Sequence, residues 1–160
     1  MPPFLVQWSD AWASVYSNSA LLRTGLGFAH IAGLVVSAGS ALVVDRATLR
    51  AWRSDAGGRL AHARAFDATH RVVLWALAVV SASGILLLAA DVETYLYSKV
   101  FWAKMAAIVV LVVNGGLLMR AGRQAAEGRD AAWLVLRYGS MASVVLWLLA
   151  TLMGAALPNV

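Results

Sequence analysis

The sequence predicts an all-α integral membrane protein built as a four-helix bundle with up-down-up-down topology. Hydrophobic residues make up 61% of the chain and charged residues only 13%, whereas soluble domains have about 45–50% and about 25%. The apolar residues are concentrated in four runs, each long enough to cross a bilayer as a helix. The connections between these runs are short, which makes sequential helices antiparallel neighbours.

Residues 1–20, ahead of the first run, are typical of a helix that lies on the membrane surface. Tryptophan anchors such helices at the level of the lipid headgroups. We therefore expect a short N-terminal interfacial helix, with a disordered terminus as the alternative. The apolar side chains that recur there at helical spacing are Leu5, Trp8, Trp12 and Val15.

The first membrane span contains no formal charge over twenty-one residues, which is roughly 31 Å of helix. We expect that helix to continue through Trp52, to a turn at Ser54–Gly58 whose paired glycines favour a break. The third span carries two polar residues, Lys104 near its start and Asn114 near its end. The four expected spans are 24–44, 72–90, 100–119 and 138–157.

The distribution of basic residues predicts the orientation. Ten of the thirteen Lys and Arg residues fall in two connections, 46–71 and 120–137. The positive-inside rule places both connections in the cytoplasm and both termini outside, which in a bacterium means the inner membrane with periplasmic termini. Because the charge is confined to alternate loops, it does not indicate a nucleic-acid-binding face. The chain has no cysteine, which excludes disulfides and thiolate metal sites.

The main candidate for chemistry is His30, an ionisable residue deep inside the first span. It lies seven residues beyond Arg23, or roughly 10 Å along the helix, and its side chain is too short to reach the membrane surface. It therefore either hydrogen-bonds across helices as a neutral imidazole, or ligates a metal or carries a proton. Small residues on the same face would let a helix or a flat ligand approach closely. They are Gly27, Gly33, Ser37 and Ser40.

The other spans also carry stripes of polar and small residues that we expect to face inward. The second span has Ser81 and Gly84, and the fourth has Ser140, Thr151 and Gly154. For the serines, and for Asn114 in the third span, we expect ordinary hydrogen bonds between helices.

The cofactor that suits a histidine in a membrane bundle is b-type haem. A second axial ligand cannot be His70, because the offset between His30 and His70 along the bundle is on the order of 18 Å. The sixth position of the iron would be either open or filled from the same level, where Lys104 and Met153 are the candidates by depth. Snorkelling to the interface is the alternative role for Lys104. We expect an interfacial polar cluster of Asp45, Arg46, Asp67 and His70.

Two segments are similar to a known family. The HIAG run that begins at His30, followed by Gly39 and Arg46, resembles the first helix of HemJ-type protoporphyrinogen oxidases. The segment Ser83–Arg120 resembles their G-x-x-L motif, aromatic loop and lysine-bearing helix. Similar patterns occur in CopD-like domains and in uncharacterised four-helix bacterial membrane families.

The HemJ resemblance implies a haem b protein whose functional pair is a first-helix histidine and a third-helix lysine. The matching positions here are His30 and Lys104. Two positions differ from the HemJ pattern: Val36-Ser37 stand where a tryptophan is expected, and the third helix ends in Met119-Arg120 without a histidine.

The leading hypothesis is therefore a membrane protein that binds haem b through His30 and carries out electron transfer or porphyrin redox chemistry. Lys104 would be the sixth iron ligand or a charge partner for a propionate or a substrate carboxylate, and Gly27, Gly33 and Met153 would line the cofactor. Expected partners are the lipid bilayer, a membrane or periplasmic redox protein, and a second copy of the chain. The alternatives are a non-catalytic structural or assembly subunit and a copper-handling membrane module.

Overall fold

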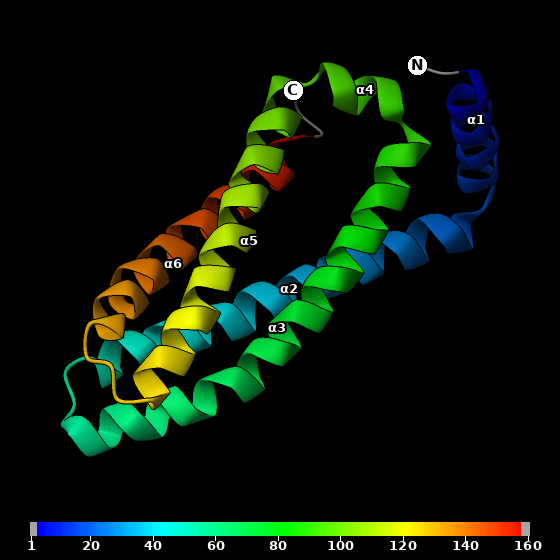
Figure 1. The fold of residues 1–160 in the computed structure, drawn as a ribbon. Helices are drawn as coiled ribbons and strands as arrows, with labels where there is room; N and C mark the ends of the chain where they lie inside the picture. Colours follow the sequence, from blue (N-terminus) through cyan, green and yellow to red (C-terminus); the bar gives the residue numbers. More distant parts are fainter. Residues whose placement is uncertain (1–2, 158–160) are drawn as a thin grey trace.

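In the computed structural model, the backbone is described for residues 3–157 and the side chains for residues 7–66 and 71–157. Every regular element in this part of the chain is a helix, so the predicted all-α fold is confirmed. Figure 1 shows the six helices in chain order: α1 (Pro3–Asn18), α2 (Ala20–Ala51), α3 (Ala56–Ala90), α4 (Val92–Tyr97), α5 (Lys99–Ala126) and α6 (Ala132–Ala156).

Four of the helices, α2, α3, α5 and α6, are long and apolar enough to cross a membrane. The chain is thus a multi-pass membrane protein. Each expected span lies within one of these helices, except that Leu157, the last residue of the fourth, is the C-cap of α6.

The four long helices form two hairpins. α2 packs along α3 and α5 along α6, while α2 also contacts α6 and α3 contacts α5. Figure 1 shows the hairpins close together near the turn at 52–55 and diverging toward α4. We call residues 20–32, 80–90, 99–110 and 151–157 the α4 half of the bundle. The remaining parts of the four long helices, toward the 52–55 turn, are the basic half.

The turn between α2 and α3, in the basic half, is shorter than the predicted turn at Ser54–Gly58 would allow. Gly57 and Gly58 were expected in the turn, but both lie in the first turn of α3. The reason is Asp55, which has extended backbone angles and accepts a hydrogen bond from the Gly58 backbone N–H at 2.8 Å. An aspartate in this position caps a helix N-terminus, so the helix begins directly after it.

At the other end, the connection between α3 and α5 folds into the short helix α4. Asp91 caps α4 through the backbone N–H of Thr94, and Ser98 caps α5 through that of Phe101. α1 is attached to the bundle by Trp12, whose indole N–H donates to the Leu86 carbonyl of α3 at 2.8 Å.

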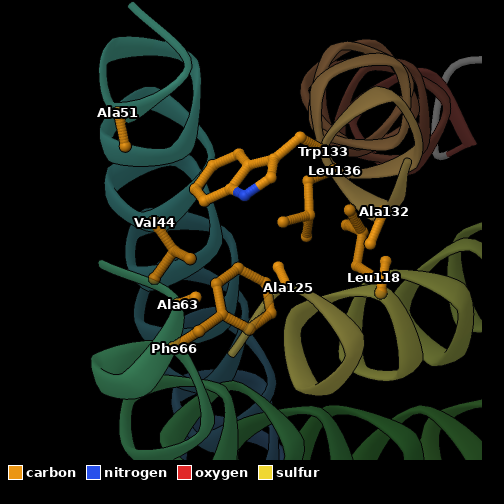
Figure 2. Packing of buried hydrophobic residues seen from close by; sticks show 10 residues of the cluster. Val44, Ala51, Ala63, Phe66, Leu118, Ala125, Ala132, Trp133 and Leu136 are labelled. Atoms are coloured by element: carbon orange, nitrogen blue, oxygen red, sulfur yellow. The ribbon is translucent and has the colours of Figure 1, made fainter. Parts of the chain in front are cut away.

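The basic half contains the larger hydrophobic core. Figure 2 shows the rings of Phe66 and Trp133 within it, together with Leu136 and Leu118. Gly122 allows α5 to approach this core, because a Cβ there would lie only 2.9 Å from Cδ1 of Phe66. A smaller core follows toward the centre of the bundle, formed by Ala41, Val73, Leu111 and Trp147.

The α4 half has no comparable core. None of the described residues in 20–32 of α2, 99–110 of α5 or 151–157 of α6 is buried. A bundle helix normally buries one face against its neighbours. In this half of the molecule the residues of these three helices are at most half-buried.

Candidate functional site

His30 projects from α2 onto α3 in the α4 half of the bundle. Its Nδ1 lies 3.1 Å from the Val80 carbonyl oxygen and 3.0 Å from Oγ of Ser83. A carbonyl can only accept, so Nδ1 carries the proton and donates. The Ser83 hydroxyl gives its own proton to the Val79 carbonyl at 2.7 Å, which leaves its oxygen able to accept from His30.

This hydrogen bonding fixes the tautomer of the imidazole. A neutral imidazole carries one proton, so Nε2 of His30 has a free lone pair. No described residue makes a hydrogen bond to Nε2. Metal-ligating histidines characteristically donate their other ring N–H to a backbone carbonyl or a similar acceptor, which fixes the ring orientation. His30 thus makes the expected hydrogen bond across helices as a neutral imidazole, and its Nε2 has no described hydrogen-bond partner.

Two glycines let the α2 and α3 helices approach around this ring. A Cβ at Gly84 would lie 3.2 Å from Cε1 of His30, and one at Gly33 would lie 2.8 Å from Cγ2 of Val80. The missing side chain of Gly33 is thus explained by helix packing. Gly27, one turn away, has nothing within 4 Å of its would-be Cβ and presents open surface.

Lys104 of α5 belongs to the same region. Its ammonium is close enough to His30 for an electrostatic interaction. Its Nζ lies against α6, where a Cβ on Gly154 would be 3.2 Å away. Met153, the neighbour of Gly154, is half-buried. The structure thus places Lys104 within electrostatic range of His30 and Met153 on α6, the helix that Lys104 contacts.

Sequence reasoning missed the partners of His30. The expected inward stripe on the second span included Ser81, but Ser81 is exposed and Ser83 is buried. The contact with Val80 uses its backbone carbonyl, so the side chain at this position could not predict it. The sequence feature that could have predicted this contact is the Ser83-Gly84 pair, in which a hydroxyl stands beside a glycine at the depth of His30.

The expected interhelical hydrogen bonds are present only in part. Asn114 of α5 donates to the Gly139 carbonyl of α6 at 3.0 Å, as predicted. Ser37 was also expected to bond across helices, but its hydroxyl donates to the Gly33 carbonyl of its own helix at 2.7 Å. Serine in a helix readily makes this bond to the fourth residue before it.

Of the expected interfacial polar cluster, Asp45 is buried at 3% exposure, whereas Arg46 is exposed. Adjacent residues of an α-helix point about 100° apart, and Asp45 faces the serine hydroxyls of α6. The side chains of Asp67 and His70, the other expected members, lie outside the described residues.

A hollow of about 590 Å³, lined by both polar and apolar residues, lies at the α4 end of the molecule. Burial, together with the nearby Asp91 and Tyr16, raises the pKa of Tyr95 above its ordinary value. The hollow is shared between α1, α2, α3 and α4. It is lined by Ala13, Ser14, Tyr16, Ser17, Arg23, Leu87, Ala90, Asp91 and Tyr95.

Comparison with known proteins identifies the family. The chain belongs to DUF6644, a family of unknown function, which it matches over residues 10–157. The matched region includes His30, Lys104 and all four long helices. No curated protein and no solved structure matches the chain.

Proposed function

We propose that this protein binds haem b through Nε2 of His30 and carries out electron transfer or porphyrin redox chemistry. The observation that carries the proposal is the anchored imidazole. Nδ1 is held by the Val80 carbonyl and Ser83, and Nε2 is left without a described partner. Histidine is a common axial ligand of haem iron, and its second-sphere hydrogen bonds tune the metal.

The low burial around His30 supports this proposal. In the α4 half no described residue of α2, α5 or α6 is buried, and a flat apolar macrocycle needs apolar surface against which to pack. Bound haem would supply one-electron redox chemistry.

Each neighbouring residue then has a role toward the haem. Lys104 would be the sixth ligand or would pair with a propionate or a substrate carboxylate, and Met153 is the other candidate for the sixth position. Gly27 would offer its open surface to the macrocycle, whereas we assign Gly33 to the contact between α2 and α3. Val80 and Ser83 would hold the imidazole plane.

We further propose that the helices form an up-down-up-down bundle in a bacterial inner membrane, with the basic half toward the cytoplasm and both termini periplasmic. α1 would lie at the outer membrane surface. The arginine-rich connections support this orientation. The resemblance to HemJ-type oxidases supports the pairing of His30 with Lys104, and a membrane or periplasmic redox protein would be the electron partner.

The test is the haem content of the purified protein, expressed with a supply of haem. The wild type is expected to carry haem, His30→Ala to lose it, and His62→Ala to retain it. His62 is the matched control because it is also a half-buried histidine, but in the basic half. A wild type that stays colourless after hemin addition, or a His30→Ala protein with full haem content, would overturn the proposal.

A second candidate function is that of a non-catalytic assembly subunit. It is favoured by the same lack of buried residues in α2, α5 and α6 of the α4 half, because a partner's transmembrane helices could pack there. This role predicts a colourless protein whose Val109→Trp variant, altered on an exposed position of α5, loses its membrane partner. The copper-handling alternative has less support, because no group of three or more His, Cys, Asp or Glu residues lies together in the described chain.

A further inference from the structure

The basic half contains a buried carboxyl group that the haem proposal does not use. Asp45 of α2 is 3% exposed and faces two hydroxyls of α6, those of Ser143 and Ser140. Ser140 is 0% exposed and Ser143 5%. All three side chains are thus more than nine-tenths buried, at the contact between the two hairpins.

Two atoms of this group lack the partners that buried polar atoms normally have. Oδ2 of Asp45 and Oγ of Ser140 make no hydrogen bond within the described part of the chain. Most buried polar atoms in proteins are paired, because leaving one unpaired costs its full desolvation penalty. A hydrogen bond between the carboxyl and the facing hydroxyl would satisfy both atoms, and a protonated carboxyl can donate it to Oγ of Ser140.

The charges around Asp45 do not neutralise it. On α6, the Arg137 guanidinium lies over the rings of Trp52 and Tyr138, at 5.3 and 5.6 Å from their centroids. On α2, Arg46 is exposed. On α3, His62 contacts Thr48, one turn from Asp45, and the side chains of 67–70 are not described. No ion pair to Asp45 is present among the described residues.

We propose that Asp45, Ser140 and Ser143 form a proton-binding site in which Asp45 is the protonated group, supplied from the basic end of the bundle. An isolated buried carboxylate is very costly, so this carboxyl needs either a proton or a cation. Hard metal ions such as calcium take six or more oxygen ligands. The described side chains offer one carboxyl and two hydroxyls here, and a proton requires only the carboxyl.

A hydrogen-bonded pair lies one turn from Asp45, toward the basic end. Thr48 lies three residues after Asp45, and its hydroxyl donates to the Val44 carbonyl at 2.9 Å. Oγ1 of Thr48 also lies 2.8 Å from Nε2 of His62. Because the Thr48 proton is used, Nε2 of His62 carries a hydrogen and donates to Thr48.

The site is independent of the haem proposal. Asp45 and His30 are fifteen residues apart on α2, or about 22 Å along the helix. The proton that Asp45 gains comes from water at the basic end and returns there, so binding changes the charge of the protein by one and involves no electron transfer.

The test is a pH-difference infrared spectrum of the purified protein in lipid nanodiscs. We expect the carbonyl band of a protonated carboxylic acid that appears as the pH falls, is absent from Asp45→Asn, and is the same with and without haem. Ser140→Ala keeps the carboxyl and is expected to shift this band, because the acid loses its hydrogen-bond acceptor. Thr151→Ala, which removes an exposed hydroxyl from the α4 half of the same helix, is the matched control and should leave the band in place.

Three results would overturn the proposal. In the first, the wild type and Asp45→Asn give the same carboxyl bands. In the second, Ser140→Ala and Ser143→Ala both leave the band unmoved, a comparison that holds even where Asp45→Asn fails to fold. In the third, replacing choline chloride with sodium chloride at constant pH abolishes the band, which would make the site a metal-ion site.

Discussion

The two halves of the bundle are built from the same kind of helix but are packed differently. In the basic half all four long helices contribute to one core, around Phe66, Trp133 and Leu136. In the α4 half, α5 has no buried residue before Leu111 in the described chain. The basic half thus holds the hairpins together, whereas His30 and Lys104 lie in the half where α2, α5 and α6 have no buried residue.

The polar residues follow the same division. In the basic half, buried polar groups such as Asp45 and Ser140 are enclosed between helices. In the α4 half, His30 is only half-buried and has one nitrogen without a described partner. An enclosed group can exchange little more than a proton, whereas a half-open one can bind a larger ligand.

The largest expected effect on the free energy of unfolding comes from truncating a phenylalanine to alanine, once in each half of the bundle. Phe66→Ala empties the centre of the basic core, where Phe66 is 2% exposed, and should reduce the free energy of unfolding by about 3–5 kcal/mol. Phe28→Ala, at 72% exposure in the α4 half, is the matched control and should change it little. Denaturant titration in detergent measures both. Equal losses would contradict the division into a packed and an open half.

Glycine-to-alanine changes sharpen the comparison further. In Gly122→Ala the new Cβ would lie 2.9 Å from the Phe66 ring, and such overpacking costs about 1–3 kcal/mol. In Gly25→Ala nothing lies within 4 Å, so the better helix propensity of alanine should stabilise by up to about 1 kcal/mol. Thermal unfolding of the two variants should therefore shift in opposite directions. A stabilised Gly122→Ala protein would show that α5 and α3 are not in close contact.

The two N-cap aspartates, Asp55 and Asp91, should give a smaller difference in the free energy of unfolding between the two ends of the bundle. Asp55→Ala removes the hydrogen bond to Gly58 in the basic half, 2.8 Å long, and should cost about 1 kcal/mol. The corresponding bond from Asp91 to Thr94 at the α4 end is 3.4 Å long, so Asp91→Ala should cost less. Asp55→Asn keeps the cap and serves as the control. If Asp91→Ala cost more free energy of unfolding than Asp55→Ala, the α4 end would be the more tightly held one.

The smallest effect concerns Tyr95, beyond the ends of the spanning helices. Its pKa is raised by burial, by Asp91 and by Tyr16. A raised pKa in the folded state favours the neutral phenol, so this stabilisation is present below the unfolded value of about 10 and is lost as the pH rises through the folded value. Tyrosinate absorbance should therefore titrate at lower pH in Asp91→Asn than in the wild type. An unchanged titration would remove Asp91 from the environment of Tyr95.

The sequence predicts the long helices because length and hydropathy are local properties of a chain. It also identifies His30, since an ionisable residue deep in an apolar run is rare. The rotation of each helix is harder to predict. α3 is apolar on most of its surface, so nothing in its pattern shows that Ser83 rather than Ser81 faces α2. The burial of Asp45 likewise depends on which helix packs beside it, and α6 follows almost a hundred residues later.

The central claim is that the α4 half presents Nε2 of His30 to a haem iron, and imidazole rescue tests it most directly. His30→Gly, loaded with hemin and given free imidazole, should recover the reduced-minus-oxidised difference spectrum of the wild type, because the small molecule replaces the lost ring. His62→Gly should need no imidazole. A His30→Gly spectrum that equals the wild type before imidazole is added, or that stays flat afterwards while the wild type shows haem bands, would contradict the claim.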